Sequence, residues 1–141
     1  MIFLDENFLV RLLVAPQSEQ DHLMVERAAR LLRSALSGRR EITTSEAVLA
    51  EVAYVLSGTS YRIGRTEIAA GLTRLLQLRG FKSPFKTTWM EAMEIWVNRP
   101  SLSIVDSLAA AHCIESGMEI ATIDRKLSQL PGLVTYPGDN P

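Results

Sequence analysis

The sequence predicts an α/β protein of three layers (α/β/α), in which helices cover both faces of a central parallel sheet. The first observation is that short apolar runs alternate with longer segments of helical periodicity, separated by short connections. The second is that two of these runs, at residues 2–4 and 120–123, each end in an aspartate, Asp5 and Asp124. Ligands of an open parallel sheet bind outside the carboxyl ends of its strands. We therefore expect both carboxylates to face one crevice.

The predicted elements alternate along the chain, and most of their ends carry local signals. Strands are predicted at residues 1–4, 41–43, 119–123 and 133–136, the first of them buried because every position is apolar. Helices are predicted at 7–15, 18–37, 45–57, 66–79, 88–99 and 103–116, with a short helical turn after Asp124. Hydroxyl or acidic side chains stand at the starts. Ser18 and Asp21 have the spacing of a capping box for the second helix, and Thr44 or Ser45 is the cap of the third. Glycine or proline follows the ends.

Length and composition fit one soluble globular domain spanning residues 1–141. Apolar residues make up 47% of the chain and charged residues 22%, which is ordinary for that class. The single cysteine, Cys113, excludes an internal disulfide and suggests a reducing compartment. Charged residues interrupt the apolar start, unlike a signal peptide, and no apolar stretch is long enough to cross a membrane. We therefore expect a cytoplasmic protein.

The charge balance does not decide whether the partner is a nucleic acid. The formal net charge is −1, whereas nucleic-acid-binding domains are more often basic. An acidic metal site would hide part of this difference, because bound cations convert clustered carboxylates into a centre that attracts phosphate.

Three aspartates stand where helices begin, and each has a purely structural alternative. Asp5 is a possible N-cap of the helix near Asn7, unless Asn7 caps that helix and leaves Asp5 facing the crevice. Ser103 and Asp106 have the spacing of a capping box. Asp124 has the position of an N-cap for the turn that follows it. Each acid alone is weak evidence, and their joint placement is stronger.

A fourth acid, Glu51, lies inside the third predicted helix. At about 100° per residue, it falls at the edge of an apolar stripe, whereas Glu46 points to solvent. Glu51 is therefore the acid of this helix that we assign to a site, although a glutamate at a helix edge is more often simply solvated. The stripe consists of Val48, Leu49, Val52, Val55 and Leu56.

Four segments in this order carry a more specific signal. They are residues 2–13 (IFLDENFLVRLL), 44–52 (TSEAVLAEV), 104–111 (IVDSLAAA) and 121–127 (ATIDRKL). Together they resemble the PIN domain family, and in particular the toxin ribonucleases of type II (VapBC-like) toxin–antitoxin pairs. The resemblance runs from the first residue to the last predicted strand.

The resemblance implies a set of metal-binding acids. Asp5, Glu51, Asp106 and Asp124 would be the catalytic, metal-binding carboxylates for Mg²⁺ or Mn²⁺, ions that prefer oxygen ligands. Two polar residues would support them: Asn7 beside the first aspartate, and Thr122 just ahead of the last. The chain departs from the family at Glu6, where threonine is more common, and that carboxylate either alters metal affinity or faces solvent.

The implied activity is hydrolysis of RNA phosphodiester bonds by metal-activated water, as an endoribonuclease toxin. Arg125 and Lys126, beside Asp124, are candidates for substrate binding. The resemblance also implies a homodimer and a cognate antitoxin that covers the acidic crevice. The main alternative is a non-catalytic PIN-fold module that acts by binding a protein partner. A phospho-receiver domain fits less well, because no aspartate ends a plausible middle strand.

Overall fold

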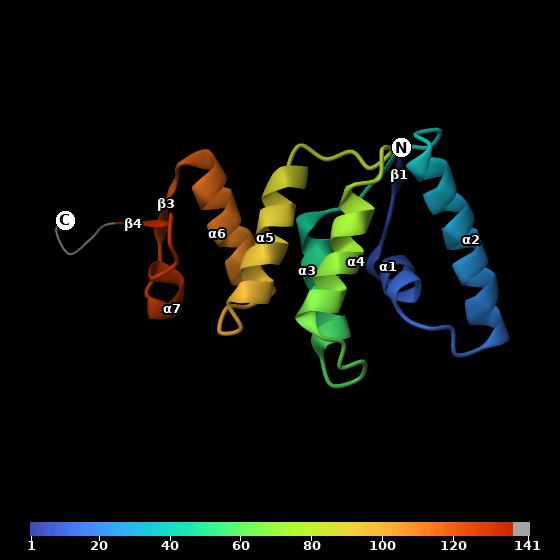
Figure 1. The fold of residues 1–141 in the computed structure, drawn as a ribbon, viewed down its shortest axis with the longest axis horizontal. Helices are drawn as coiled ribbons and strands as arrows, with labels where there is room; N and C mark the ends of the chain where they lie inside the picture. Colours follow the sequence, from blue (N-terminus) through green and yellow to red (C-terminus); the bar gives the residue numbers. More distant parts are fainter. Residues whose placement is uncertain (137–141) are drawn as a thin grey trace. The chain divides into compact units, whose positions relative to one another are not determined.

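The computed structural model describes residues 1–136 and has the predicted α/β class. In these residues it contains seven helices and two separate pairs of parallel strands (Figure 1). The chain divides into two compact units, one of residues 1–86 and one beginning at Thr87, and each is described by itself. That residues 1–141 form one domain stays a prediction, and residues 137–141 lie outside the described part. None of the helices within residues 1–136 combines the length and apolar character that crossing a bilayer requires.

The first unit contains two short parallel strands and four helices. They are β1 (Ile2–Phe3), α1 (Glu6–Leu13), α2 (Glu19–Leu36), β2 (Ile42–Thr43), α3 (Glu46–Ser57) and α4 (Arg65–Leu76). Ile2 pairs with Ile42 and Phe3 with Thr43, and Phe81 extends this pairing through a bridge to Ile42. Both strands run in the same direction, so their carboxyl ends meet at one edge of the sheet, just before α1 and α3 begin.

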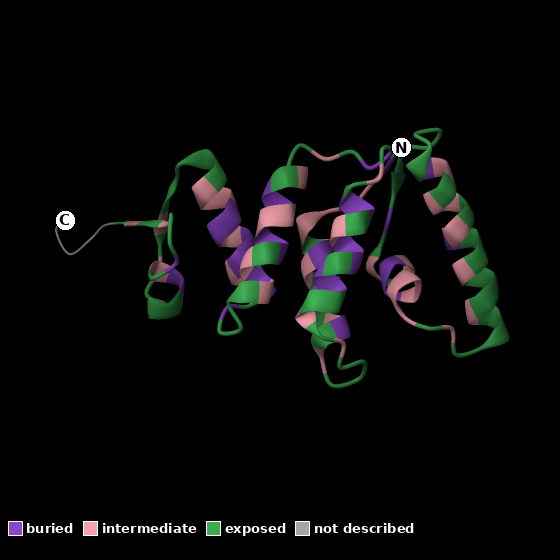
Figure 2. Cartoon of the chain, viewed as in Figure 1, coloured by how far each residue is buried: buried purple, intermediate pink, exposed green. Residues whose placement is uncertain are grey.

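The core of the first unit lies between its helices. Helix α1 packs against α2 and α3, and α3 packs against α4. Figure 2 shows that buried residues recur along α4, and both α3 and α4 contribute several residues to this core. The largest fully buried side chains here are Leu4, Leu9, Ile42, Leu49, Val52, Leu56, Ile68, Leu72, Leu76 and Phe81.

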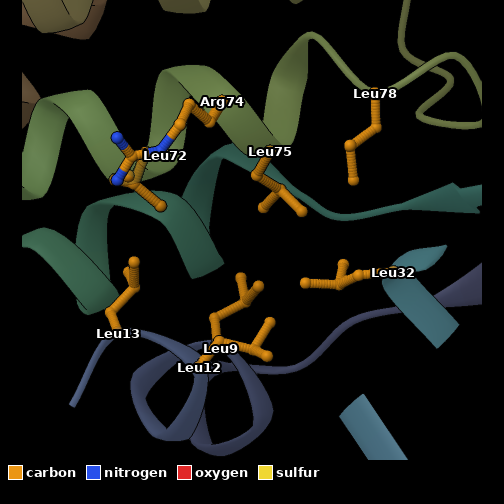
Figure 3. A pocket seen from close by; sticks show the side chains of 9 residues that line it. Leu9, Leu12, Leu13, Leu32, Leu72, Arg74, Leu75 and Leu78 are labelled. Carbon is orange, nitrogen blue, oxygen red and sulfur yellow. The ribbon is translucent and has the colours of Figure 1, made fainter. Parts of the chain in front are cut away.

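An apolar cavity of about 230 Å³ remains between α1, α2 and α4 (Figure 3). Leucines from all three helices point into it, and Arg74 of α4 also lines it. Gly71 lies in the wall that α4 forms, where the absence of a side chain lets α1 approach closely. The lining residues are Leu9, Leu12, Leu13, Leu32, Gly71, Leu72, Arg74, Leu75 and Leu78.

The second unit contains a second parallel pair of strands and three helices. They are α5 (Lys86–Asn98), whose first residue closes the first unit, α6 (Ile104–Ser116), β3 (Glu119–Ala121), α7 (Arg125–Ser128) and β4 (Val134–Tyr136). Strands β3 and β4 pair from Glu119 opposite Val134 to Ala121 opposite Tyr136. Gly117 ends α6 in the left-handed conformation, with φ of 65°, which glycine adopts without strain. Leu102, Ala110, Leu127 and Leu130 form an apolar cluster in this unit.

Several sequence-based boundaries and one burial prediction need correction. The prediction of a fully buried first strand is wrong, since Phe3 is 56% exposed and Ile2 is also exposed, while Leu4 is 2% exposed. An apolar run shows that a strand tolerates burial, but the elements packed on each face decide whether burial happens. Helix α4 ends at Leu76, earlier than predicted, and α5 begins at Lys86, earlier than predicted.

Candidate metal centre

Asp5 stands directly after β1 and caps α1. Its Oδ1 accepts a hydrogen bond from the backbone N–H of Phe8, 3.0 Å away, in the geometry of an N-cap. The alternative in which Asn7 caps the helix is wrong, because α1 begins at Glu6. The side chain of Asp5 is nevertheless exposed, and its Oδ2 has no hydrogen-bond partner within residues 1–136. Capping therefore uses one carboxylate oxygen and leaves the other available.

A buried hydroxyl, which the sequence left as an ambiguous cap, holds the chain just ahead of Asp5. Ser45 is the N-cap of α3, since its Oγ accepts from the N–H of Val48 at 3.2 Å. Thr44 is buried instead, and its Oγ1 donates to the carbonyl oxygen of Leu4 at 2.7 Å. This bond joins the ends of β1 and β2 immediately before Asp5. The only sequence signal for it was a polar residue at the end of a strand.

The solvent exposures of Glu51 and Glu46 are the reverse of those predicted. Glu51 is exposed on α3 and has no hydrogen-bond partner within the described residues, whereas Glu46 is half-buried. The prediction failed because it counted only large apolar side chains. The small Ala53 is fully buried, which turns the centre of the buried face toward Glu46 and away from Glu51. An exposed Glu51 still has both oxygens available to a ligand.

Asp106 opens α6 in the capping box that its spacing from Ser103 predicts. The Oγ of Ser103 accepts from the N–H of Asp106 at 3.0 Å, and Asp106 Oδ2 accepts from the N–H of Ser103 at 3.1 Å. Asp106 is half-buried, and its Oδ1 has no hydrogen-bond partner in the described part of the chain. The reciprocal bonds restrict rotation of the carboxylate while leaving this one oxygen to act as a ligand.

Asp124 caps α7 and is positioned by Thr122. The backbone N–H of Asp124 donates to Thr122 Oγ1 at 3.0 Å, and Asp124 Oδ1 accepts from the N–H of Lys126 at 2.9 Å. Asp124 is half-buried, whereas the side chains of Arg125 and Lys126 are exposed beside it. Thr122 thus fixes the backbone at the aspartate, and two exposed basic residues follow that aspartate in the chain.

The two polar neighbours of Asp5 have different surroundings. Glu6 is half-buried in the first turn of α1, where a negative charge interacts favourably with the helix dipole. Asn7 is exposed and lines a second cavity together with Arg11, and no hydrogen bond joins its side chain to Asp5 among the described residues. Its supporting role toward Asp5 stays a prediction.

The four predicted acids are divided between the two units. Asp5 and Glu51 belong to the first, and Asp106 and Asp124 belong to the second. Within residues 1–136, the structure places no group of three or more histidine, cysteine, aspartate or glutamate side chains together for metal binding. Convergence of all four carboxylates on one ion stays a prediction.

Comparison with known protein families matches residues 2–133 to the PIN domain. This chain belongs to the PIN domain family. PIN domains are generally nucleases that use divalent metal ions. The matched region contains all four acids in the order that the sequence suggested. No curated protein gives a significant match to the chain.

The donor chemistry of this PIN domain suits a hard divalent cation. Each of the four acids offers carboxylate oxygens, and each keeps at least one oxygen without a partner in the described residues. Mg²⁺ and Mn²⁺ prefer oxygen ligands and retain water at their remaining positions. The residues present therefore fit the ion that the family uses.

Proposed function

We propose that this PIN domain is a Mg²⁺- or Mn²⁺-dependent endoribonuclease that acts as the toxin of a toxin–antitoxin pair. The observation that carries the proposal is the family match over residues 2–133, which includes Asp5, Glu51, Asp106 and Asp124. Three of these acids stand at helix starts, where backbone N–H groups hold one oxygen of each carboxylate. Such fixed, partly used carboxylates are suited to binding an ion in a defined orientation.

Each of these residues has a specific task in the proposed reaction. The four acids would hold the ion. When bound, such an ion lowers the pKa of a coordinated water molecule and neutralises negative charge on the phosphate. Asp5, Asp106 and Asp124 keep their orientation through the bonds described above. Arg125 and Lys126 would bind the phosphate backbone of the RNA, since their exposed cations lie beside Asp124. The caps thus pre-organise the ligands, and the cations position the substrate.

The toxin role adds partners to this proposal, namely a cognate antitoxin protein and a second copy of the chain. Support comes from the resemblance of the four segments and from exposed apolar side chains on α2, such as Leu23 and Leu36. Cytoplasmic RNA would be the substrate. Expression of the wild-type chain alone should arrest bacterial growth, and expression of Asp106→Asn should not. Equal growth with both proteins at equal abundance would contradict the toxin role.

Nuclease activity is tested directly on a labelled pool of total RNA, with Mn²⁺ or Mg²⁺ compared with EDTA. The wild type should cut only with metal, and Glu51→Gln should lose this cleavage. Glu46→Gln is the matched control, because it removes the same charge from the same helix outside the proposed site. Full cleavage by Glu51→Gln, or equal losses in both variants, would remove Glu51 from the site. A folded wild type that cuts no RNA would favour a role in protein binding.

A further inference from the structure

A second cavity of about 230 Å³ lies in the first unit, against α1 and the connection from α1 to α2. Its walls are partly apolar, being formed by Val10, Val14, Pro16 and Val25. Polar side chains from α1, from this connection, from α2 and from the segment between α3 and α4 also line it. Apolar walls with a few convergent polar groups are the usual form of a small-ligand site.

Three polar groups of this cavity are available to a ligand. The carboxamide of Asn7 and the hydroxyl of Tyr61 have no hydrogen-bond partner within residues 1–136. The side-chain Nε2 of Gln17 donates to the backbone carbonyl oxygen of Ala15 at 3.4 Å, which leaves the side-chain oxygen Oε1 of Gln17 as an acceptor. Together these groups offer both donors and acceptors to the edge of an occupant.

The charged groups of the cavity neutralise each other. Arg11 forms an ion pair with Asp21, and Asp21 Oδ2 also accepts from the backbone N–H of Gln17 at 3.2 Å. A phosphate or carboxylate ligand would need an uncompensated cation, and the described lining offers none. The chemistry therefore favours an uncharged occupant with a polar edge, such as a nucleobase.

Tyr61 is presented to this cavity by a strained segment. The next residue, Arg62, has φ of 54°, a conformation that residues other than glycine seldom adopt. Its N–H donates to Gly58 O at 2.8 Å, and the N–H of Ile63 donates to Leu56 O at 2.9 Å, so the segment is closed on itself. Strain of this kind persists only where the surroundings enforce it, and it is concentrated at binding sites. Tyr61 stays 41% exposed, so its side chain is accessible for stacking.

The cavity and the first acid of the proposed metal centre share helix α1, which Asp5 caps and which supplies Asn7 to the lining. Asn7 follows Asp5 by two residues in the first turn of α1, and Arg11 lies one turn further along the same face. An occupant that contacts Asn7 would therefore lie within the first turn of α1 from Asp5. In the proposed site, a single-stranded RNA would place a phosphate at the ion that Asp5 helps to bind, and a nearby base in the cavity.

We propose that this cavity binds one unstacked base of the RNA substrate, with Tyr61 as the stacking surface and Asn7 and Gln17 as the groups that recognise the base edge. Sequence-specific proteins recognise single-stranded RNA in this way, by stacking splayed bases on aromatic rings and bonding their edges. The inference rests on the proposed ribonuclease function and adds to it the residues that would make the protein prefer one RNA base over another.

The test measures RNA binding in EDTA, where metal-dependent cleavage cannot interfere. The probes are end-labelled oligo(U) strands that carry a single A, C, G or U at the central position. Their binding to the protein is measured by fluorescence anisotropy. We expect the wild type to prefer one central base. Tyr61→Ala should weaken binding of that strand roughly 5- to 100-fold, as loss of a stacked aromatic ring does. Tyr61→Phe should retain most of the affinity, and Asn7→Ala should change the preferred base.

Tyr54→Ala is the matched control, because Tyr54 is 73% exposed on α3 and does not line the cavity. It should bind like the wild type, and circular dichroism should show equal folding of all variants. Wild-type affinity of Tyr61→Ala for all four probes, or no binding by the wild type, would overturn the inference. Cleavage with Mn²⁺ is measured separately. If the protein cuts RNA but Tyr61→Ala binds it as well as the wild type does, the base-binding role of the cavity is rejected and the nuclease function is kept. If binding depends on Tyr61 but no RNA is cut, the nuclease function is rejected and the base-binding role is kept.

Discussion

Replacing Gly80 with alanine should destabilise the first unit by crowding the backbone beside β2. A Cβ at this position would lie 2.1 Å from the carbonyl oxygen of Arg40, 2.8 Å from that of Ala35 and 3.0 Å from the Ala35 Cα. These are backbone atoms, so no side-chain rotation relieves the contact. Gly80 also donates to Ala35 O at 2.8 Å and accepts from the N–H of Ile42 at 2.8 Å. Moving the chain to relieve the contact weakens both bonds.

The magnitude follows from these two effects. Overpacking of this kind costs about 1–3 kcal/mol. Weakening two backbone hydrogen bonds adds about 1–2 kcal/mol, given that each contributes roughly 1 kcal/mol. The free energy of unfolding should therefore fall by about 2–5 kcal/mol, a large share of the ~5–15 kcal/mol typical of a domain. Because Ile42 precedes the bond between Thr44 and Leu4, the positioning of Asp5 should loosen as well.

Urea denaturation followed by far-UV circular dichroism measures this loss. Gly64→Ala is the matched control, because a Cβ there meets nothing within 4 Å and its φ of −66° suits alanine. The control should change stability by less than about 1 kcal/mol, since glycine is only a moderately favoured N-cap. Equal stabilities of Gly80→Ala and Gly64→Ala would refute the reasoning.

Three further predictions concern packing, charge and metal. Gly71→Ala should change stability by less than about 1 kcal/mol in the same urea assay. Its Cβ would lie 2.5 Å from a methyl group of Leu13, but that group borders the apolar cavity and can rotate into it. Alanine also improves the helix propensity of α4 by up to ~1 kcal/mol. A loss of stability above about 2 kcal/mol would contradict this prediction. A double-mutant cycle of Arg11→Ala and Asp21→Ala should give a coupling of about 0.5–1 kcal/mol that shrinks in roughly 1 M salt, as for a partly exposed pair. No coupling at low salt would be the contrary result. Mn²⁺ at about 100 times its Kd should stabilise the wild type by roughly 2.7 kcal/mol in thermal melts and Asp106→Asn by less. Melting temperatures unmoved by Mn²⁺ would count against a metal site.

Features encoded in a few neighbouring residues were predictable from the sequence. The capping box of Ser103 and Asp106, the N-cap at Ser18 and the left-handed end of α6 at Gly117 all have the expected geometry. Each depends on local backbone chemistry, in which a short side chain satisfies an N–H group or glycine adopts a positive φ. The resemblance to the PIN domain family, which depends on four segments in order, was confirmed over residues 2–133, and the toxin subgroup stays a prediction.

Features that depend on contacts between distant segments were not predictable. The exposures of Glu46 and Glu51 depend on how α3 packs between α1 and α4, which the periodicity of one helix does not contain. Asp21 was expected to complete a capping box with Ser18. Its carboxylate instead pairs with Arg11 on another helix, and only its backbone N–H bonds to Ser18 Oγ, at 3.1 Å. Ion pairs between different helices can be identified only when the positions of both helices are known.

The central claim is that Asp5 is a metal ligand and not solely a helix cap, and one substitution separates the two roles. Asparagine caps helices as well as aspartate does, so Asp5→Asn keeps the bond from the Phe8 N–H but removes the charge that a cation needs. The measurement is the rate of Mn²⁺-dependent RNA cleavage by Asp5→Asn and by wild type, at matched thermal stability. Metal-dependent cleavage by the wild type that is lost in Asp5→Asn is the predicted result. Cleavage at the wild-type rate in the variant would show that Asp5 serves the helix alone and would contradict the proposed metal centre.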